Sequence, residues 1–202
     1  MKVIEQLLTN AGIAPIAGVD EAGRGACAGP LVIASVVLHD PFAHELAVVR
    51  DSKEIPESKR DAVFELIQSI AASVSVVIVP ASEVDARGVH AANLDGMRRA
   101  VQGLSVEPAY VLTDGYAIEG LGVPNLAVWK GDQVVVSISA ASVIAKVTRD
   151  RIMREMDAEF PQYGFAGHKG YITAAHTKAL NEHGPCAQHR TSFANVAALI
   201  HK

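Results

Sequence analysis

The chain has 202 residues, of which 50% are hydrophobic and 20% charged, so it can bury a substantial core and is too apolar to be disordered. Two distant cysteines and the lack of a long apolar run argue against a disulfide framework and a membrane-spanning helix. The composition therefore predicts a soluble, cytoplasmic protein of one domain over residues 1–202 with no membrane partner. We also expect a monomer, although the composition itself does not determine the oligomeric state.

The formal net charge of −4 is distributed unevenly along the chain. Residues 1–128 hold 9 Lys and Arg against 16 Asp and Glu, whereas residues 129–202 hold 9 against 6. This asymmetry is typical of an acidic half that carries a site and a basic half that meets a polyanion. An ordinary solvated surface with uneven charges explains the same numbers, so the motifs must decide.

The first half of the chain predicts strands that are followed by helices. Apolar runs predict strands over residues 16–20 and 31–38, separated by a glycine-rich loop over residues 21–30. An apolar face predicts a helix over residues 56–72, and a β-branched run predicts a strand over residues 74–79.

The second half predicts alternating strands and helices. Ser82 is a candidate N-cap, and a helix is expected over residues 89–104. Strands are expected over residues 110–113 and 126–129, with Trp129 in the core, and helices over 134–159 and 173–183. The order predicts an α/β domain with a mixed sheet, and a helical C-terminal part, from about residue 160 to 202, packed alongside.

Acidic residues follow three of the predicted strands. Asp20 and Glu21 follow the first, Asp114 follows the strand at 110–113, and Asp132 comes shortly after Trp129. If these strands are neighbours, four carboxylates share one space, and Mg²⁺ or Mn²⁺ would relieve their repulsion. Each Asp beside a Gly is, taken alone, more often a turn residue.

Two other features have competing explanations. Gly23, Arg24 and Gly25 resemble a dinucleotide-binding loop, but such a loop opens a helix, whereas Pro30 and a strand follow here. A glycine loop can instead bring its backbone close to a substrate sugar. The histidines at 168, 176 and 183 lack a compact ligand pattern, so surface or loop positions are favoured over a zinc site.

Seven spaced motifs resemble the bacterial ribonuclease HII family, the type 2 ribonucleases H. In chain order they occupy residues 18–25, 51–53, 114–115, 130–132, 140–150, 163–171 and 189–193. The resemblance covers roughly residues 16 to 193. Arg24 within the glycine loop favours the HII enzymes over the related HIII enzymes. Two departures, Ala26-Cys27 in place of a proline and Gln133 in place of a small residue, remove no catalytic group.

The resemblance implies a ribonuclease H-like fold, with the C-terminal helical part as one wall of the substrate cleft. It implies two divalent ions, Mn²⁺ or Mg²⁺, held by Asp20, Glu21, Asp114 and Asp132. It also implies a backbone-reading loop at Gly23, Arg24 and Gly25, and a tyrosine at Tyr171 that senses the junction of ribonucleotide and deoxyribonucleotide.

The implied activity is hydrolysis of the RNA strand of RNA–DNA hybrids, and cleavage 5′ of ribonucleotides embedded in duplex DNA. The products would carry 3′-hydroxyl and 5′-phosphate ends, and the role would be ribonucleotide removal from DNA. Lys53 and Lys146 are candidate phosphate contacts, with a solvated charge or support of the carboxylates as alternatives. A ribonuclease H-like nuclease that cuts DNA branches and a non-catalytic hybrid-binding module remain the competing functions.

Overall fold

The computed structural model describes residues 3–200, which form a five-stranded mixed sheet in the order β3-β2-β1-β4-β5. The strands are β1 (Ile16–Ala22), β2 (Leu31–Leu38), β3 (Ala71–Val79), β4 (Tyr110–Asp114) and β5 (Asn125–Val128). β1, β2 and β3 pair in antiparallel fashion, and β1, β4 and β5 pair in parallel. The expected mixed sheet is confirmed.

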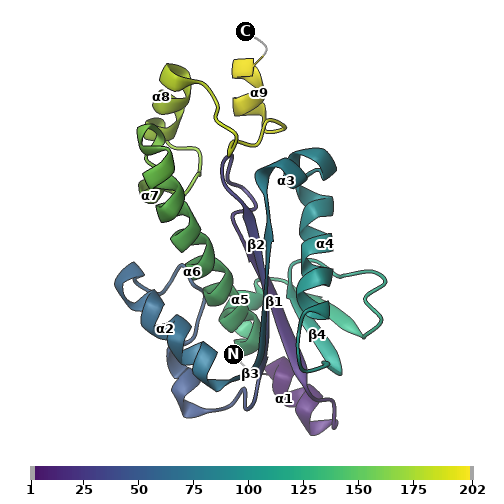
Figure 1. The fold of residues 1–202 in the computed structure, drawn as a ribbon. Helices are drawn as coiled ribbons and strands as arrows, with labels where there is room; N and C mark the ends of the chain where they lie inside the picture. Colours follow the sequence, from purple (N-terminus) through teal and green to yellow (C-terminus); the bar gives the residue numbers. More distant parts are fainter. Residues whose placement is uncertain (1–2, 201–202) are drawn as a thin grey trace.

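Helices cover both faces of the sheet (Figure 1). On one face, α6 (Val136–Glu159) lies against β1 and β2, and α2 (Glu57–Ile70) packs beside it. On the other face lie α3 (Ala81–Arg87) and α4 (Val89–Gln102). Alternate residues of β2 enter the two cores, which is why this strand is apolar throughout and every one of its residues is buried.

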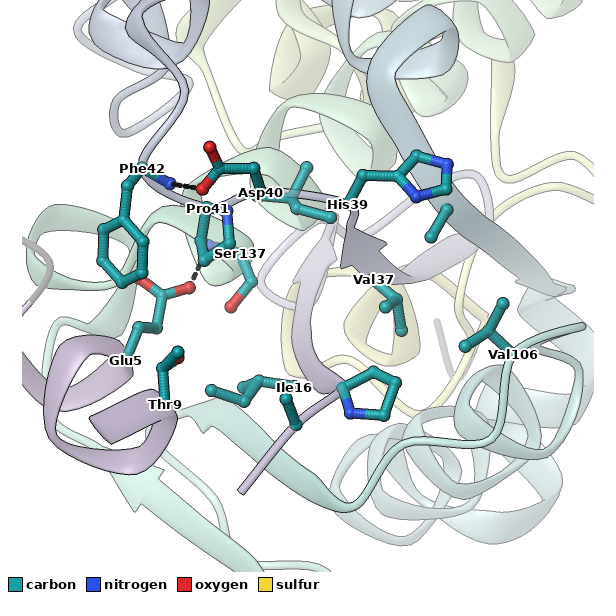
Figure 2. A pocket seen from close by; sticks show the side chains of 14 residues that line it. Glu5, Thr9, Ile16, Val37, His39, Asp40, Pro41, Phe42, Val106 and Ser137 are labelled. Carbon is teal, nitrogen blue, oxygen red and sulfur yellow. Dashed lines mark hydrogen bonds between the residues drawn. The ribbon is translucent and has the colours of Figure 1, made fainter. Parts of the chain in front are cut away.

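The start of α6 is fixed by an N-terminal helix, α1 (Val3–Asn10), that the sequence analysis did not predict. The fully buried Glu5 carboxylate accepts hydrogen bonds from the backbone N–H groups of Val136 and Ser137, at 2.9 and 3.0 Å. These N–H groups have no partner within the helix, so the carboxylate acts as a cap. Figure 2 shows Glu5 beside Ser137 at the edge of an apolar cavity of about 430 Å³, near the beginning of β1.

Gly18 allows β1 to approach the start of α6 closely. A Cβ atom at this position would lie 2.1 Å from the Ser137 carbonyl carbon, a distance that no side chain tolerates. The middle of β1 is thereby held against the same turn of α6 that Glu5 caps. This contact sets the position of Asp20, two residues further along β1.

The C-terminal helices gather at the far end of α6, beside the β1–β2 loop (Figure 1). They are the short η2 (Pro161–Tyr163) and α7 (Phe165–His168), then α8 (Ala174–His183) and α9 (Ala194–Ile200). The loop hydrogen bonds to this part of the chain from Cys27 N–H to Gly170 O and from Gly29 N–H to Gln188 O.

Several predicted ends of helices and strands were wrong, and each difference has a local cause. Ser82 is not an N-cap, because α3 already begins at Ala81, directly after Pro80. The expected helix at 134–159 is broken by Val135, which is extended and separates a short α5 (Gly131–Val134) from α6. β3 begins at Ala71, where pairing with β2 overrides the helical pattern. One more short helix, η1 (His44–Val48), lies between β2 and α2. No helix within residues 3–200 has the length and apolar character needed to cross a bilayer.

Candidate metal and nucleic-acid site

Three parallel strands bring the predicted carboxylates together. Asp20 and Glu21 lie at the end of β1, Asp114 is the last residue of β4, and Asp132 follows β5 in α5. Because β1, β4 and β5 are parallel neighbours, their carboxyl ends meet at one edge of the sheet. One oxygen atom from each of Asp20, Asp114 and Asp132 lies within 4.8 Å of the other two.

Backbone groups fix two of these carboxylates. Asp20 Oδ1 accepts a hydrogen bond from the Glu21 N–H at 2.7 Å, and Asp114 Oδ1 accepts one from the Gly131 N–H at 2.7 Å. The second bond joins β4 to the start of α5, which carries Asp132. The side chains are thus held close together although they repel one another.

Burial and mutual repulsion raise the pKa values of Asp20, Glu21 and Asp132. The pKa of Asp20 is raised well above its usual range, first by burial and then by Glu21 and Asp114. Burial, reinforced by Asp114, raises the pKa of Glu21 to about 7. Burial, followed by Asp114 and Asp51, raises the pKa of Asp132 to about 6. The site therefore favours a positive charge in its centre.

The donor set fits hard divalent cations. All of the groups are carboxylate oxygens, which Mg²⁺ and Mn²⁺ prefer over nitrogen or sulfur. Glu21 Oε2 is buried and has no hydrogen-bond partner, so it is free to take a cation. Within residues 3–200, Asp20, Asp114 and Asp132 form the one group of three or more potential ligands with atoms this close. Glu21 adjoins the group through its interaction with Asp114.

The sequence analysis did not assign roles to two further polar residues at this site. Asp51 is 5% exposed and lies beside Asp132, whose pKa it helps to raise. Ser142 lies near Asp20, whose pKa it lowers, and its hydroxyl donates to the Oγ of Ser52 at 3.0 Å. Both residues lie within motifs that support the resemblance, which was the signal available in the sequence.

The two candidate lysines occupy different environments. The Lys53 side chain is 79% exposed, and its Nζ lies 3.7 Å from Asp132 and 3.9 Å from Asp51. Partial burial alone would lower the pKa of Lys53, but these carboxylates raise it above its usual value. Lys146 is paired with Asp150 at 2.7 Å, and burial lowers its pKa. Lys53 is thus the more available cation.

The glycine loop and Tyr171 border the same space as the carboxylates. A cavity of about 440 Å³ is lined by Asp20, Glu21 and Asp114, by the loop residues Gly23, Arg24 and Gly25, and by Ser52, Lys53, Ser142, Lys146 and Tyr171. Tyr171 is 40% exposed. The structure therefore brings all of the predicted site residues except Asp132 to one cavity, and Asp132 lines the adjoining one.

Two buried arginines, which the sequence analysis did not single out, hold the glycine loop against the Tyr171 segment. Arg149 is 1% exposed and donates to the carbonyl oxygens of Pro30, Lys169 and Ala28. Arg190 is fully buried and donates to the carbonyl oxygens of Gly29 and Arg24. We refer to Arg149 and Arg190 as the arginine clamp.

Gly23 fits against the arginine clamp because it has no side chain. Its φ of +91° favours glycine, and a Cβ atom there would lie 1.9 Å from Arg149 Nε. The Arg149 guanidinium carbon also lies 5.5 Å from the centre of the Tyr171 ring. One side chain therefore lies against both the glycine loop and the Tyr171 ring.

Two neutral histidines, His189 and His176, form a series of hydrogen bonds that ends at the backbone of Tyr171. The Cys186 N–H donates to His189 Nδ1 at 3.0 Å, so the proton of His189 is on Nε2, which faces His176 Nε2 at 3.0 Å. His176 Nδ1 then donates to the carbonyl oxygen of Tyr171 at 3.0 Å. Burial lowers the pKa of His176, and it lowers that of His189 to about 4. The predicted surface position was wrong for His176, which is fully buried.

One further expectation for a side chain near the site was wrong. Trp129 was expected in the core, but it is 82% exposed and lines a second cavity of about 480 Å³ with Glu21, Asp114 and Asp132.

Both the sequence and the fold are similar to those of known proteins. The family model described as Ribonuclease HII matches residues 17–196. A protein named Ribonuclease HII from Acidothermus cellulolyticus is 57% identical over 95% of this chain, which spans 62% of that protein. One from Mycolicibacterium smegmatis is 55% identical over 97% of this chain and 72% of its own length. The crystal structure of the ribonuclease H2 from Pyrococcus horikoshii superimposes with a TM-score of 0.79 at 26% identity, covering 91% of this chain and 96% of that one.

Proposed function

Because this chain belongs to the ribonuclease HII family, we propose that it is a metal-dependent endoribonuclease that hydrolyses the RNA strand of RNA–DNA hybrids and cuts 5′ of ribonucleotides embedded in duplex DNA. The cluster of Asp20, Asp114 and Asp132, with oxygen atoms within 4.8 Å of one another, is the observation that carries the proposal. The repulsion within such a cluster favours the binding of cations.

In this proposal, Asp20, Glu21, Asp114 and Asp132 hold two Mg²⁺ or Mn²⁺ ions. Bound there, the ions would supply an activated water and would neutralise the charge that develops on the leaving oxygen. The carboxylates would hold the ions in place. Hydrolysis forms a bond between the water oxygen and phosphorus and breaks the bond from phosphorus to the 3′ oxygen, which takes up a proton, so that the products carry 3′-hydroxyl and 5′-phosphate ends. Lys53 contacts a phosphate and fixes the position of the substrate without reading its sequence.

Recognition of a ribonucleotide requires contact with its 2′-hydroxyl, which is both a donor and an acceptor. The backbone of Gly23, Arg24 and Gly25 borders the carboxylate cavity and offers both kinds of group. Tyr171, across the same cavity, packs on the sugar at the junction. The arginine clamp keeps these two elements at a fixed distance from each other and from the metal ligands.

The enzyme acts as a single ribonuclease H-like catalytic domain, as a monomer in the cytoplasm, and removes ribonucleotides from DNA. Lys146, which is paired with Asp150, supports the cavity wall and has a weaker claim to a phosphate contact than Lys53.

A cleavage assay tests the proposal. The substrate is a labelled DNA duplex with one ribonucleotide, incubated with Mg²⁺, with Mn²⁺ or with a chelator, and an all-DNA duplex of the same sequence is the control. We expect metal-dependent cutting at the 5′ side of the ribonucleotide and no cutting of the control. Equal cutting of both duplexes would indicate a DNA-directed nuclease, and binding without cutting would indicate a hybrid-binding module; either result contradicts the proposal.

A further inference from the structure

Trp129 is the most exposed of the large hydrophobic side chains in residues 3–200, with 82% of its surface accessible. A single exposed apolar side chain needs no explanation by itself, so its surroundings must decide whether it has a role. Trp129 lies between β5, which ends at Val128, and α5, which begins at Gly131. It is thus three residues from the proposed metal ligand Asp132.

The turn that exposes the indole is the one that positions Asp132. Lys130 has the left-handed conformation, with φ 53° and ψ 45°, which is uncommon for a residue other than glycine. After this turn, the Gly131 N–H donates to Asp114 and α5 carries Asp132 into the carboxylate cluster. Because the backbone is constrained on both sides, the Cα atom of Trp129 is held close to the proposed metal ligands.

The indole and Tyr171 line adjoining cavities of the site. The two cavities share Glu21, Lys53 and Asp114; Tyr171 lines the cavity of about 440 Å³, and Trp129 lines that of about 480 Å³. The shared carboxylates therefore border two cavities, each with an exposed aromatic side chain. A substrate that passes over the carboxylates leaves the Tyr171 cavity and enters the Trp129 cavity.

The chemistry of this second cavity suits a nucleic-acid backbone. An indole offers a large flat surface that packs on sugars and bases whatever their sequence. Lys130 beside it is exposed and can pair with a phosphate, as can Lys53, which lines both cavities. No base-reading group is needed for such a contact, because the reaction is directed by the 2′-hydroxyl and not by base identity.

We propose that Trp129, together with Lys130, is a second substrate contact, which packs on the sugar–phosphate backbone of the duplex in the cavity that adjoins that of Tyr171. This inference rests on the proposed function, because it needs a duplex bound over the carboxylates. It adds a binding surface that extends the footprint of the enzyme beyond the junction.

The chain has one tryptophan, so its fluorescence reports on this contact directly. A labelled duplex with one ribonucleotide is titrated with the Asp20→Asn variant in Mg²⁺, which keeps the strand uncut. Binding is followed by anisotropy of the label, and indole emission is recorded on the same samples. We expect the emission to change with the same midpoint as the anisotropy.

Variants then measure the size of the contact. In the same background, Trp129→Ala should weaken binding about fivefold or more, equally for two duplexes of different base sequence, and Trp129→Phe should restore most of it. Leu126→Ala is the matched control, because Leu126 is an exposed β5 residue that does not line the cavity. With Asp20 intact, Trp129→Ala should raise KM and leave kcat within about twofold.

Duplex binding with unchanged indole emission, and equal affinity of the Trp129→Ala variant, would overturn this inference while cleavage by the wild-type chain still supported the proposed function. A loss of affinity that depends on the bases near the site would also overturn it, because it would indicate base reading. Failure of the wild-type chain to cut at the ribonucleotide would contradict the proposed function itself.

Discussion

The carboxylate cluster and the wall behind Tyr171 both place charge inside the protein. The wall consists of the arginine clamp with His176 and His189. It gives every guanidinium nitrogen a hydrogen-bond acceptor, whereas the cluster leaves like charges close together and one buried carboxylate oxygen without a partner. In the wall, each nitrogen of the Arg149 and Arg190 guanidinium groups donates to a backbone carbonyl oxygen. In the cluster, the carboxylates of Asp20 and Asp114 face each other, and Glu21 Oε2 has no partner.

This difference indicates that the two regions have different roles within one site. A group without partners is available for a ligand, at a cost in stability, whereas a fully hydrogen-bonded group rigidifies its surroundings. The cluster is therefore the part that binds cations, and the wall is the part that keeps the glycine loop and Tyr171 in place. Substitutions in the two regions should have opposite effects on stability.

The largest expected effect is on activity in the cluster. Asp114→Asn or Asp132→Asn keeps the size of the side chain but removes a ligand charge, so the rate of cleavage should fall by more than the roughly 10–100-fold that loss of an outer-shell partner costs. The melting temperature should not fall, since repulsion is relieved. Asp61→Asn, at an exposed position on α2, is the control. Near-normal cleavage by both cluster variants would contradict the metal assignment.

The next effect is on stability in the wall. Arg149→Lys keeps the charge but cannot reach three carbonyl oxygens, so the free energy of unfolding should fall by about 3 kcal/mol or more. Arg151→Lys, two residues along the same helix, changes an exposed ion pair with Asp61 and should cost less than about 1 kcal/mol. Denaturant unfolding measures both. Equal effects of the two substitutions would show that the arginine clamp has no special role.

A smaller effect is expected at Tyr171. Tyr171→Ala should lower kcat/KM at a lone ribonucleotide, because the ring no longer packs on the sugar. The loss should correspond to about 1–3 kcal/mol of transition-state stabilisation. Tyr171→Phe should separate packing from hydrogen bonding. The two variants are compared on the single-ribonucleotide duplex and on a long hybrid, alongside a thermal melt. Wild-type cleavage of the first duplex by a normally folded Tyr171→Ala variant would exclude the junction role.

The smallest expected effect is a pH dependence from His189. The pKa of His189 is lowered from 6.5 to about 4 by burial, so the unfolded state binds more protons than the folded state between these values. The contribution of His189 to stability is complete above about pH 6.5 and is lost as the pH falls through this range.

His189→Gln removes the titrating group and retains an N–H donor toward His176. Its melting temperature should fall less steeply than that of the wild type as the pH is lowered from about 6.5 to 4, and the exposed His44→Gln variant should follow the wild type. If the melting temperatures of all three proteins fell equally steeply with pH, His189 would not be buried in its neutral form.

The sequence predicted the cluster better than the wall because the two depend on different kinds of information. Asp20, Asp114 and Asp132 follow apolar strands, and parallel pairing of those strands is enough to bring them together. The arginine clamp depends on contacts such as that between Arg190 and Arg24, which are 166 positions apart. A local pattern of charges cannot distinguish a buried arginine from a solvated one.

Trp129 illustrates the opposite error. An aromatic residue at the end of an apolar strand is usually buried, so the pattern predicted core packing. The left-handed turn at Lys130 ends the strand early, and nothing in the identity of that lysine signals such a turn. The exposed indole and the position of Asp132 have the same cause, which becomes visible only when the backbone is known.

The most direct test of the account is the effect of divalent cations on the stability of the cluster. Thermal melts of the wild type and of Asp132→Asn are recorded with a chelator and then with increasing Mn²⁺ or Mg²⁺. The free energy of unfolding of the wild type should rise by up to about 2.7 kcal/mol when the cation concentration reaches a hundred times its Kd. The variant should be equally or more stable without the cation, and its free energy of unfolding should rise much less when the cation is added. Equal gains for both proteins, or no gain for the wild type, would contradict the claim that these carboxylates form the metal site.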